Sequence, residues 1–177
     1  GIDVILPIYW YTPYELPWSQ PGIEKLAEAL EITRTQGVTP PAVGMFMDTT
    51  SSTGKDLRIE SEQAYLYSHL KFFFTTIPRD YWALAEDSRP IVWFYTANWP
   101  IAYDQSFIDY LYLHFEEDFG VRPYLVFENG WDYPTETIDG VQVKNYNTSH
   151  LKYDAGYSWG GAVSPIISPQ IASIGPG

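Results

Sequence analysis

The sequence contains no cysteine, which excludes disulfide frameworks, thiolate nucleophiles and cysteine-ligated zinc sites. Basic residues are also few: 10 Lys and Arg stand against 22 Asp and Glu, and the formal net charge is -12. An acidic chain of this kind repels phosphate backbones, so we expect no nucleic-acid partner. No run of about 18 apolar residues occurs, so we expect no membrane insertion either.

Histidine is also scarce, with three in the chain. His69 and His114 fall in predicted helices and His150 falls in a polar loop, so the three form no metal-ligand spacing. The serines lack a Gly-x-Ser-x-Gly context, and no glycine-rich phosphate loop follows the first predicted strand. The sequence therefore predicts no metal, no cofactor and no catalytic triad.

Aromatic residues, by contrast, are abundant. They make up 18% of the 177 residues, and the 7 Trp and 15 Tyr outnumber the 9 Phe. Most of these rings carry a polar group, so they suit a cleft that binds carbohydrate as well as a core. For each single ring, core packing is the favoured interpretation. The length and the apolar content of 45% predict one folded domain over residues 1–177.

Apolar runs of strand length alternate with segments whose apolar residues recur at three-and-four spacing, which is typical of helices. One predicted helix begins at Ser19 or Gln20 and stops at Gly37, a second passes through residues 65–74 and ends by Pro78, and a third runs from Asp104 to Gly120. Residues 132–150 form a polar, turn-rich stretch. Strands are predicted at residues 4–9, 42–47, 91–96 and 123–128, with shorter ones at 157–163 and 172–174.

This alternation predicts an α/β fold with parallel strands, because buried parallel strands read as continuous apolar runs. A doubly wound sheet and a (β/α) barrel share the order, and the missing phosphate loop favours the barrel. A complete eight-stranded barrel takes about 250 residues, so we expect a partial (β/α)8 TIM-type barrel of about five to six parallel strands. Such a partial barrel has open sheet edges, and we expect the remainder of a longer chain or other subunits to cover them.

In both architectures ligands bind at the carboxyl ends of the strands. Indole and phenol rings together with carboxylates follow the predicted strands, and such a rim suits sugar recognition, because pyranose faces stack on rings while hydroxyls bond to acids. The predicted substrate-binding residues are Tyr9, Trp10, Tyr11, Thr49, Tyr95, Trp99, Asn129, Trp131, Asp132 and Trp159.

Glu128 and Asp48 are the predicted catalytic residues. Glu128 ends an apolar strand, where desolvation would raise its pKa towards that of a general acid. Asp48 ends an earlier strand, but the sequence Asp48-Thr49-Thr50 also fits a capping turn. Asp132 could be a partner acid or a solvated loop residue.

Six segments of the chain form a recognisable series: residues 1–10 (GIDVILPIYW), 43–49 (VGMFMDT), 89–95 (RPIVWFY), 122–126 (RPYLV), 158–162 (SWGGA) and 174–177 (IGPG). In the same order, these segments resemble the glycoside hydrolase family 99-like barrels, most closely a bacterial branch. The resemblance implies a (β/α) barrel and a polysaccharide or glycan substrate, since the known relatives are retaining endo-α-mannosidases and endo-α-mannanases.

The resemblance does not extend to the catalytic acids. Those enzymes carry them in an Asn-Glu-Trp-His-Glu type segment after the Gly-Pro-Gly stretch, and these 177 residues contain no such segment. Glu128 and Asp48 correspond at best to substrate-binding positions of the family. Two functions follow: a glycoside hydrolase of O-glycosyl bonds, or a non-catalytic carbohydrate-binding or structural surface protein. The acidity, the lack of cysteine and the resemblance indicate an extracellular or cell-surface location.

Overall fold

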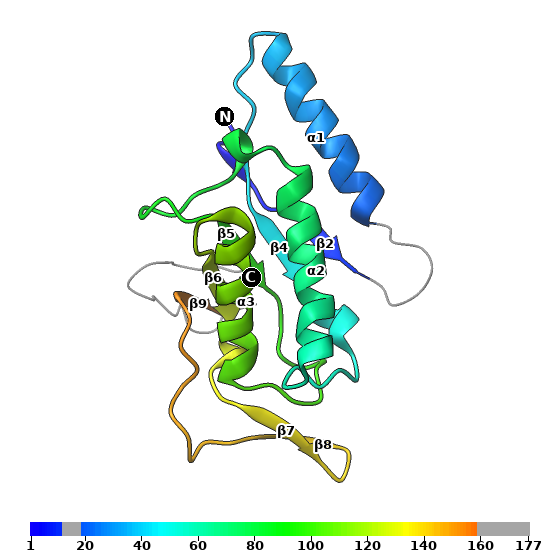
Figure 1. Cartoon of the computed structure of the whole chain (residues 1–177), viewed down its shortest axis with the longest axis vertical. Coiled ribbons are helices and arrows are strands. Elements are labelled where there is room, and N and C mark those ends of the chain that lie inside the picture. The colour runs from blue at the N-terminus through cyan, green and yellow to red at the C-terminus, as the bar shows by residue number, and fades with distance from the viewer. Residues whose placement is uncertain (12–18, 159–177) are drawn as a thin grey trace.

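The computed structural model describes residues 1–11 and 19–158 (Figure 1). Its main sheet is fully parallel, and its strands follow one another across the sheet in the order in which they occur in the chain. The predicted α/β class is confirmed, and the strand order lacks the reversal that a doubly wound sheet requires. The strands are β2 (Ile8–Trp10), β4 (Met45–Asp48), β5 (Ile91–Phe94), β6 (Tyr124–Glu128) and β9 (Ala155–Tyr157).

The first two predicted strands each occur as two pieces. β1 (Val4–Ile5) pairs with β3 (Ala42–Val43), and the chains continue into β2 and β4. Pro7 has no N–H to donate, so the ladder is interrupted beside it. Gly44 faces this interruption: a Cβ there would lie 2.6 Å from Cδ2 of Leu6 and 3.2 Å from the carbonyl of Ile91. A side chain at this position would displace Leu6 and crowd the carbonyl of Ile91, which favours glycine.

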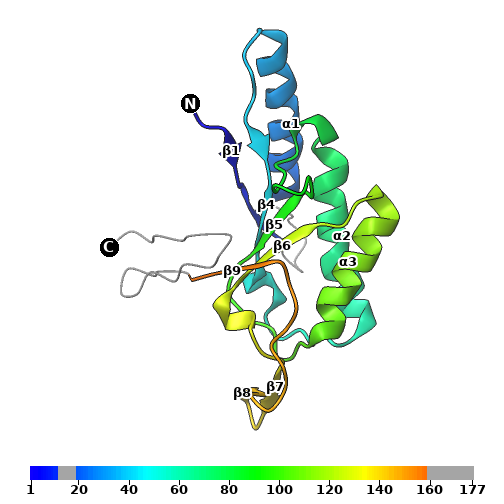
Figure 2. The same cartoon turned by 90° about the vertical axis from the view of Figure 1, so that its left-hand side faces the viewer.

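The three helices connect the successive strands and all cover the same face of the sheet (Figure 2). They are α1 (Ser19–Thr35), α2 (Glu60–Thr76) and α3 (Gln105–Phe119). Both ends of α3 are set by the predicted signals. The Asp104 side chain accepts the N–H of Ser106 at its start, and Gly120 takes a left-handed φ of 68° at its end. Shorter 3-10 turns are η1 (Thr49–Ser52), η2 (Arg79–Tyr81) and η3 (Asn129–Trp131).

The hydrophobic core lies between this face and the helices. Alternate residues of each strand point into it, such as Met47, Phe94 and Phe127, and they meet Phe73 of α2 and Phe115 of α3. Each fully buried side chain of this size contributes about 1.5–3 kcal/mol. The other residues of each strand therefore point to the opposite face, which the helices leave uncovered.

A β-hairpin corrects the expectation of a turn-rich stretch at residues 132–150. β7 (Thr135–Ile138) and β8 (Val141–Lys144) pair antiparallel and project from the body (Figure 1). Asp139 and Gly140 join them with φ values of 50° and 77°, as a two-residue turn with left-handed residues demands. The prediction of a turn-rich stretch without strands was wrong. Asp-Gly between β-branched residues is itself a hairpin signal, so the hairpin could have been predicted from the sequence.

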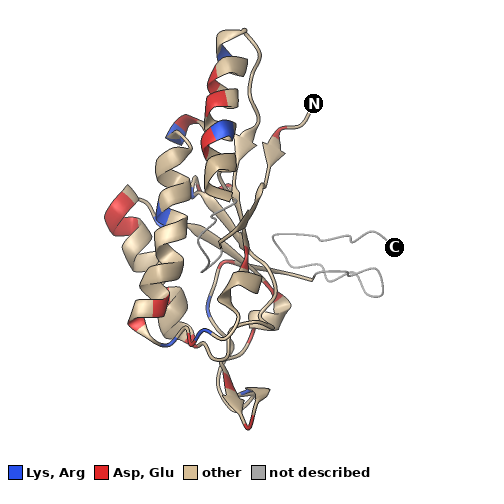
Figure 3. Ribbon diagram, turned by 90° about the vertical axis from the view of Figure 1, so that its right-hand side faces the viewer, with Lys and Arg blue, Asp and Glu red and all other residues tan. Residues whose placement is uncertain are grey.

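Two shorter predicted strands fall at the limit of the described residues. β9 begins two residues earlier than predicted, at Ala155, while residues 159–163 and the strand predicted at 172–174 lie outside the described part. Acidic residues are distributed along the helices, near the strand ends and in the hairpin (Figure 3). Within residues 1–11 and 19–158, no helix has the length and apolar character needed to cross a membrane.

Candidate functional site

The carboxyl ends of the parallel strands bring five side chains into one row. The register places Trp10 beside Asp48 and Glu128 beside Tyr157. Tyr95 follows β5 directly, its N–H donates to the carbonyl of Met47 at 3.0 Å, and its ring lies 6.1 Å from that of Phe46. Met47, Phe94 and Phe127 point to the helices. The residue that follows each of them therefore points to the face of the sheet opposite the helices. We call this set, Trp10, Asp48, Tyr95, Glu128 and Tyr157, the strand-end row.

The two predicted catalytic residues are close in this row. They lie on β4 and β6 with β5 between them, so their Cα atoms are about 10 Å apart, twice the strand spacing. Burial raises the pKa of Tyr157, and the neighbouring Glu128, Tyr95 and Asp48 raise it further. All four groups thus share one electrostatic environment, and the hydroxyl of Tyr157 donates to the carbonyl of Phe94 at 3.2 Å.

Glu128 lies in an environment that raises the pKa of its carboxyl group. Its carboxylate is half-buried, and desolvation raises its pKa above the ordinary value. The N–H of Gly130, which donates to Oε2 at 2.7 Å, and the nearby Lys144 ammonium oppose this increase, while Asp132 adds to it. A group in this position holds its proton at a higher pH than an exposed glutamate does.

Asp48 caps a turn, as its second interpretation predicted. Its Oδ1 accepts the N–H of Thr50 at 3.0 Å and so begins η1. A carboxylate has a second oxygen, so capping does not remove Asp48 from the row. Thr49 is fully buried instead, and its hydroxyl donates to the carbonyl of Thr96 at 2.6 Å. Thr49 therefore holds two strand ends together and does not line the row.

Three of the predicted sugar-binding rings lie in the core. The hydroxyl of Tyr9 is 3.1 Å from Nδ1 of His69, and the hydroxyl of Tyr11 is 2.5 Å from Oγ of Ser52. Trp131 is fully buried, and its Nε1 donates to the carbonyl of Tyr95 at 2.6 Å. This corrects the predicted role of Tyr9, Tyr11 and Trp131, since a ring packed on all sides offers no face to a ligand.

Two predicted tryptophans remain accessible. Trp10, in the row, is 41% exposed, and Trp99, in the loop after β5, is 43% exposed. The loop that carries Trp99 is held in place, because the carbonyl of Trp99 accepts the N–H of Gly54 at 3.1 Å. Both indoles are thus presented to solvent near the strand ends. Trp159 lies outside the described residues.

Asn129 and Asp132 connect the end of β6 to the segment that leads into β9. Oδ1 of Asn129 lies 3.0 Å from the place that a Cβ of Gly156 would take. Asp132 is partly buried, accepts a hydrogen bond from the hydroxyl of Tyr153, and accepts the N–H of Leu151 at its carbonyl at 2.8 Å. Asp132 is therefore a hydrogen-bonded anchor and not a solvated loop residue.

Two members of the site were not predicted from the sequence. Tyr157 joins the row through the pairing of β9 with β6, and Lys144 approaches Glu128 from the hairpin. The pairing is non-local, so no local pattern marks Tyr157. Lys144 could have been found from the Asp-Gly hairpin signal, because the register of the hairpin places it opposite Thr135.

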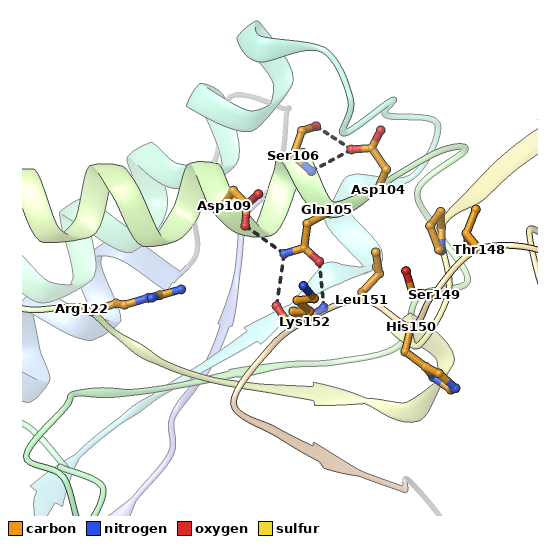
Figure 4. A pocket seen from close by; sticks show the side chains of 11 residues that line it. Asp104, Gln105, Ser106, Asp109, Arg122, Thr148, Ser149, His150, Leu151 and Lys152 are labelled. Atoms are coloured by element: carbon orange, nitrogen blue, oxygen red, sulfur yellow. Dashed lines mark hydrogen bonds between the residues drawn. The ribbon is translucent and has the colours of Figure 1, made fainter.

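A pocket of about 600 Å³ lies elsewhere, between the start of α3 and the loop before β9 (Figure 4). The side chain of Gln105 crosses its wall, where Nε2 donates to the carbonyl of Lys152 at 3.2 Å and Oε1 accepts its N–H at 2.7 Å. Asp109 and Arg122 also line it, and none of the predicted site residues does. In the described part of the chain, no group of three His, Asp or Glu side chains could hold a metal ion.

Comparison with known proteins gives one match. Residues 1–164 match the model of a family described as "Domain of unknown function (DUF5010)". No protein of curated function and no solved structure matches the chain.

Proposed function

The chain belongs to the DUF5010 family, and we propose that its strand-end row binds a glycan and hydrolyses O-glycosidic bonds. The observation that carries the proposal is the register of the sheet, which brings Trp10, Asp48, Tyr95 and Glu128, with the buried Tyr157 beside them, to the face opposite the helices. Two carboxylates and several amphipathic rings are the chemistry that a sugar needs.

The roles follow from the environment of each residue. The raised pKa of Glu128 suits the acid that protonates the leaving oxygen. Asp48 is the second carboxylate. Glycosidases place their two carboxyl groups about 5–9.5 Å apart, and two side chains whose Cα atoms are about 10 Å apart can reach such a separation. The exposed indoles of Trp10 and Trp99 offer faces on which pyranose rings stack.

The sheet supports a finer proposal for the fold, that of a partial (β/α)8 barrel. Strands that follow chain order, with every described helix on one face, are the arrangement of a barrel wall. The uncovered face would then be the barrel interior, and the outer strands β2 and β9 would be covered by further chain or other subunits. The similarity to glycoside hydrolase family 99-like barrels agrees with this proposal and with an extracellular or cell-surface location.

A non-catalytic carbohydrate-binding protein is the second candidate. Both carboxylates also cap backbone turns, so each has a structural role that would keep it in place without catalysis. In that case the protein would bind the same glycans and release no product.

A paired assay separates the two candidates. Binding of neutral α-mannan oligosaccharides is measured by calorimetry, and products are separated by chromatography. Hydrolysis that Glu128→Gln abolishes, with binding retained, supports the enzyme; binding without product supports the second candidate. Leu113→Ala, on the exposed side of α3, is the control and should change neither. Absence of both binding and product contradicts the proposal.

A further inference from the structure

The β7–β8 hairpin has an inverted distribution of polar and apolar side chains. Its register places Thr135 opposite Lys144, and Thr137 opposite Gln142, on one face of the two strands. The other face carries Ile138, Val141 and Val143, which are exposed. Apart from the exposed Glu136 opposite Val143, the solvent face is aliphatic, while polar residues face the protein. This arrangement indicates that the inward polar side chains have specific partners.

These partners are backbone carbonyls of the loops at the strand ends. Nε2 of Gln142 donates to the carbonyls of Ala97 and Pro100 at 3.0 and 2.8 Å, and Oγ1 of Thr137 donates to that of Ile101 at 2.7 Å. Through these contacts the hairpin holds the loop that carries Trp99.

Lys144 makes the corresponding contact at the end of β6. Its Nζ donates to the carbonyl of Gly130 at 2.5 Å, and the hydroxyl of Tyr103 donates to the same carbonyl at 3.0 Å. The N–H of Gly130 in turn donates to Oε2 of Glu128 at 2.7 Å. A Cβ on Gly130 would lie only 2.5 Å from that oxygen, so the carboxylate packs directly on this peptide.

Lys144 differs in the sign of its charge from the other ionisable groups that act on Glu128. The charge of Glu128 raises the pKa values of Tyr103, Tyr153 and Tyr157, and Asp132 contributes further negative charge near Glu128. Asp48 and Tyr95 lie on the other side of Glu128 from Tyr157 in the row. Among the groups that act on the Glu128 carboxylate, Lys144 supplies the positive charge.

We infer that Lys144 is a positioning residue for Glu128. From β8 its ammonium fixes the Gly130 peptide that holds the carboxylate, and it keeps a positive charge beside that carboxylate. The importance of this contact for catalysis rests on the proposed function, whereas the contact itself can be measured without a glycan. The hairpin then controls the protonation of the acid as well as the position of Trp99.

The test is the titration of Glu128 in the protein labelled with ¹³C at glutamate carboxyl groups. Glu128→Gln identifies the resonance. Lys144→Gln keeps a hydrogen-bond donor and removes the charge, so the midpoint should rise by about 1 pH unit. Lys144→Arg should keep the midpoint, and Lys152→Gln is the matched control on the exposed loop before β9. An unchanged midpoint in Lys144→Gln overturns the inference.

A second measurement needs no change at Lys144. When lysines are labelled with ¹³C at Cε, the Lys144 resonance should show a step at the Glu128 midpoint, and Glu128→Gln should abolish that step. A Lys144 resonance without the step also overturns the inference. Because both titrations are made without glycan, failure of the proposed function leaves their outcome unchanged, and failure of the coupling leaves the binding assay unchanged.

Discussion

Asp48 and Glu128 end β4 and β6 in the same way. Each carboxylate accepts the N–H of the residue two positions later, Asp48 from Thr50 at 3.0 Å and Glu128 from Gly130 at 2.7 Å. Each begins a 3-10 turn, and Tyr95 lies between them after β5. The turns hold both carboxylates at one edge of the sheet, so capping and a place in the strand-end row are compatible.

Gly130→Ala tests the contact that holds Glu128. The new Cβ would lie 2.5 Å from Oε2 of Glu128 and 3.3 Å from Cβ of Ala97, so the carboxylate must leave the Gly130 N–H. Loss of this hydrogen bond should lower the free energy of unfolding by about 1–2 kcal/mol. Denaturant unfolding measures the change. Gly22→Ala, where a Cβ meets nothing within 4 Å on α1, should be neutral or stabilising; an equal loss in both variants contradicts the account.

The helices and the four longer strands were predictable because their signals are local. Asp104 caps α3 and Gly120 ends it without reference to the rest of the chain. The burial of Trp131 was not predictable, since it follows from the η3 turn, which directs the indole back into the core. A sequence shows that a tryptophan follows a strand, but only tertiary packing decides which way its ring points.

The candidate site was predictable only in part, for a related reason. Glu128, Asp48 and Trp10 were identified because each follows an apolar run, and the parallel pairing brings them to one face. Tyr157 depends on the non-local pairing of β9 with β6. Its place in the row could be found only once that register was known.

Asp154→Asn tests how β9 is held beside β6. The Asp154 carboxylate accepts hydrogen bonds from the Arg89 guanidinium and the Tyr112 hydroxyl, both at 2.7 Å, and from the N–H of Leu125 at 2.9 Å. Removal of its charge should cost about 1–3 kcal/mol of unfolding free energy, because charge-assisted bonds are lost in a partly buried site. Asp87→Asn removes an exposed partner of the same arginine and should cost under about 0.5 kcal/mol. Similar losses in thermal or denaturant unfolding would show that Asp154 has no special role.

His69 should make the protein less stable in mild acid. Burial lowers the pKa of His69 to about 4 from an ordinary value of 6.5, so the unfolded chain binds the proton more readily than the folded one. Its contribution is complete above pH 6.5 and is lost as the pH falls towards 4, by about 2.5 kcal/mol at pH 4.5.

The measurement compares the native protein with His69→Gln, which keeps a partner for the hydroxyl of Tyr9. The loss between pH 7 and pH 4.5 should be smaller in this variant, and exposed His150→Gln should behave like the native protein. Identical pH profiles for all three proteins would exclude His69 as the cause.

Glu128→Gln should stabilise the protein at neutral pH. A pKa raised by desolvation means that the folded state disfavours the ionised carboxylate, so ionisation at pH 7 reduces stability. The advantage of the variant should shrink as the pH falls and the native Glu128 becomes protonated. Thermal unfolding at several pH values checks this. A variant that is less stable than the native protein at pH 7 would contradict a Glu128 pKa raised by desolvation.

The central claim is that a glycan binds at the strand-end row, and mapping of binding by NMR tests it most directly. Neutral α-mannan oligosaccharides are added, and the side-chain and amide resonances of the protein are followed. We expect shifts at Trp10, Tyr95 and Glu128, with the α3 pocket around Gln105 and Asp109 unaffected. Shifts confined to that pocket, or none at saturating oligosaccharide, would contradict the claim.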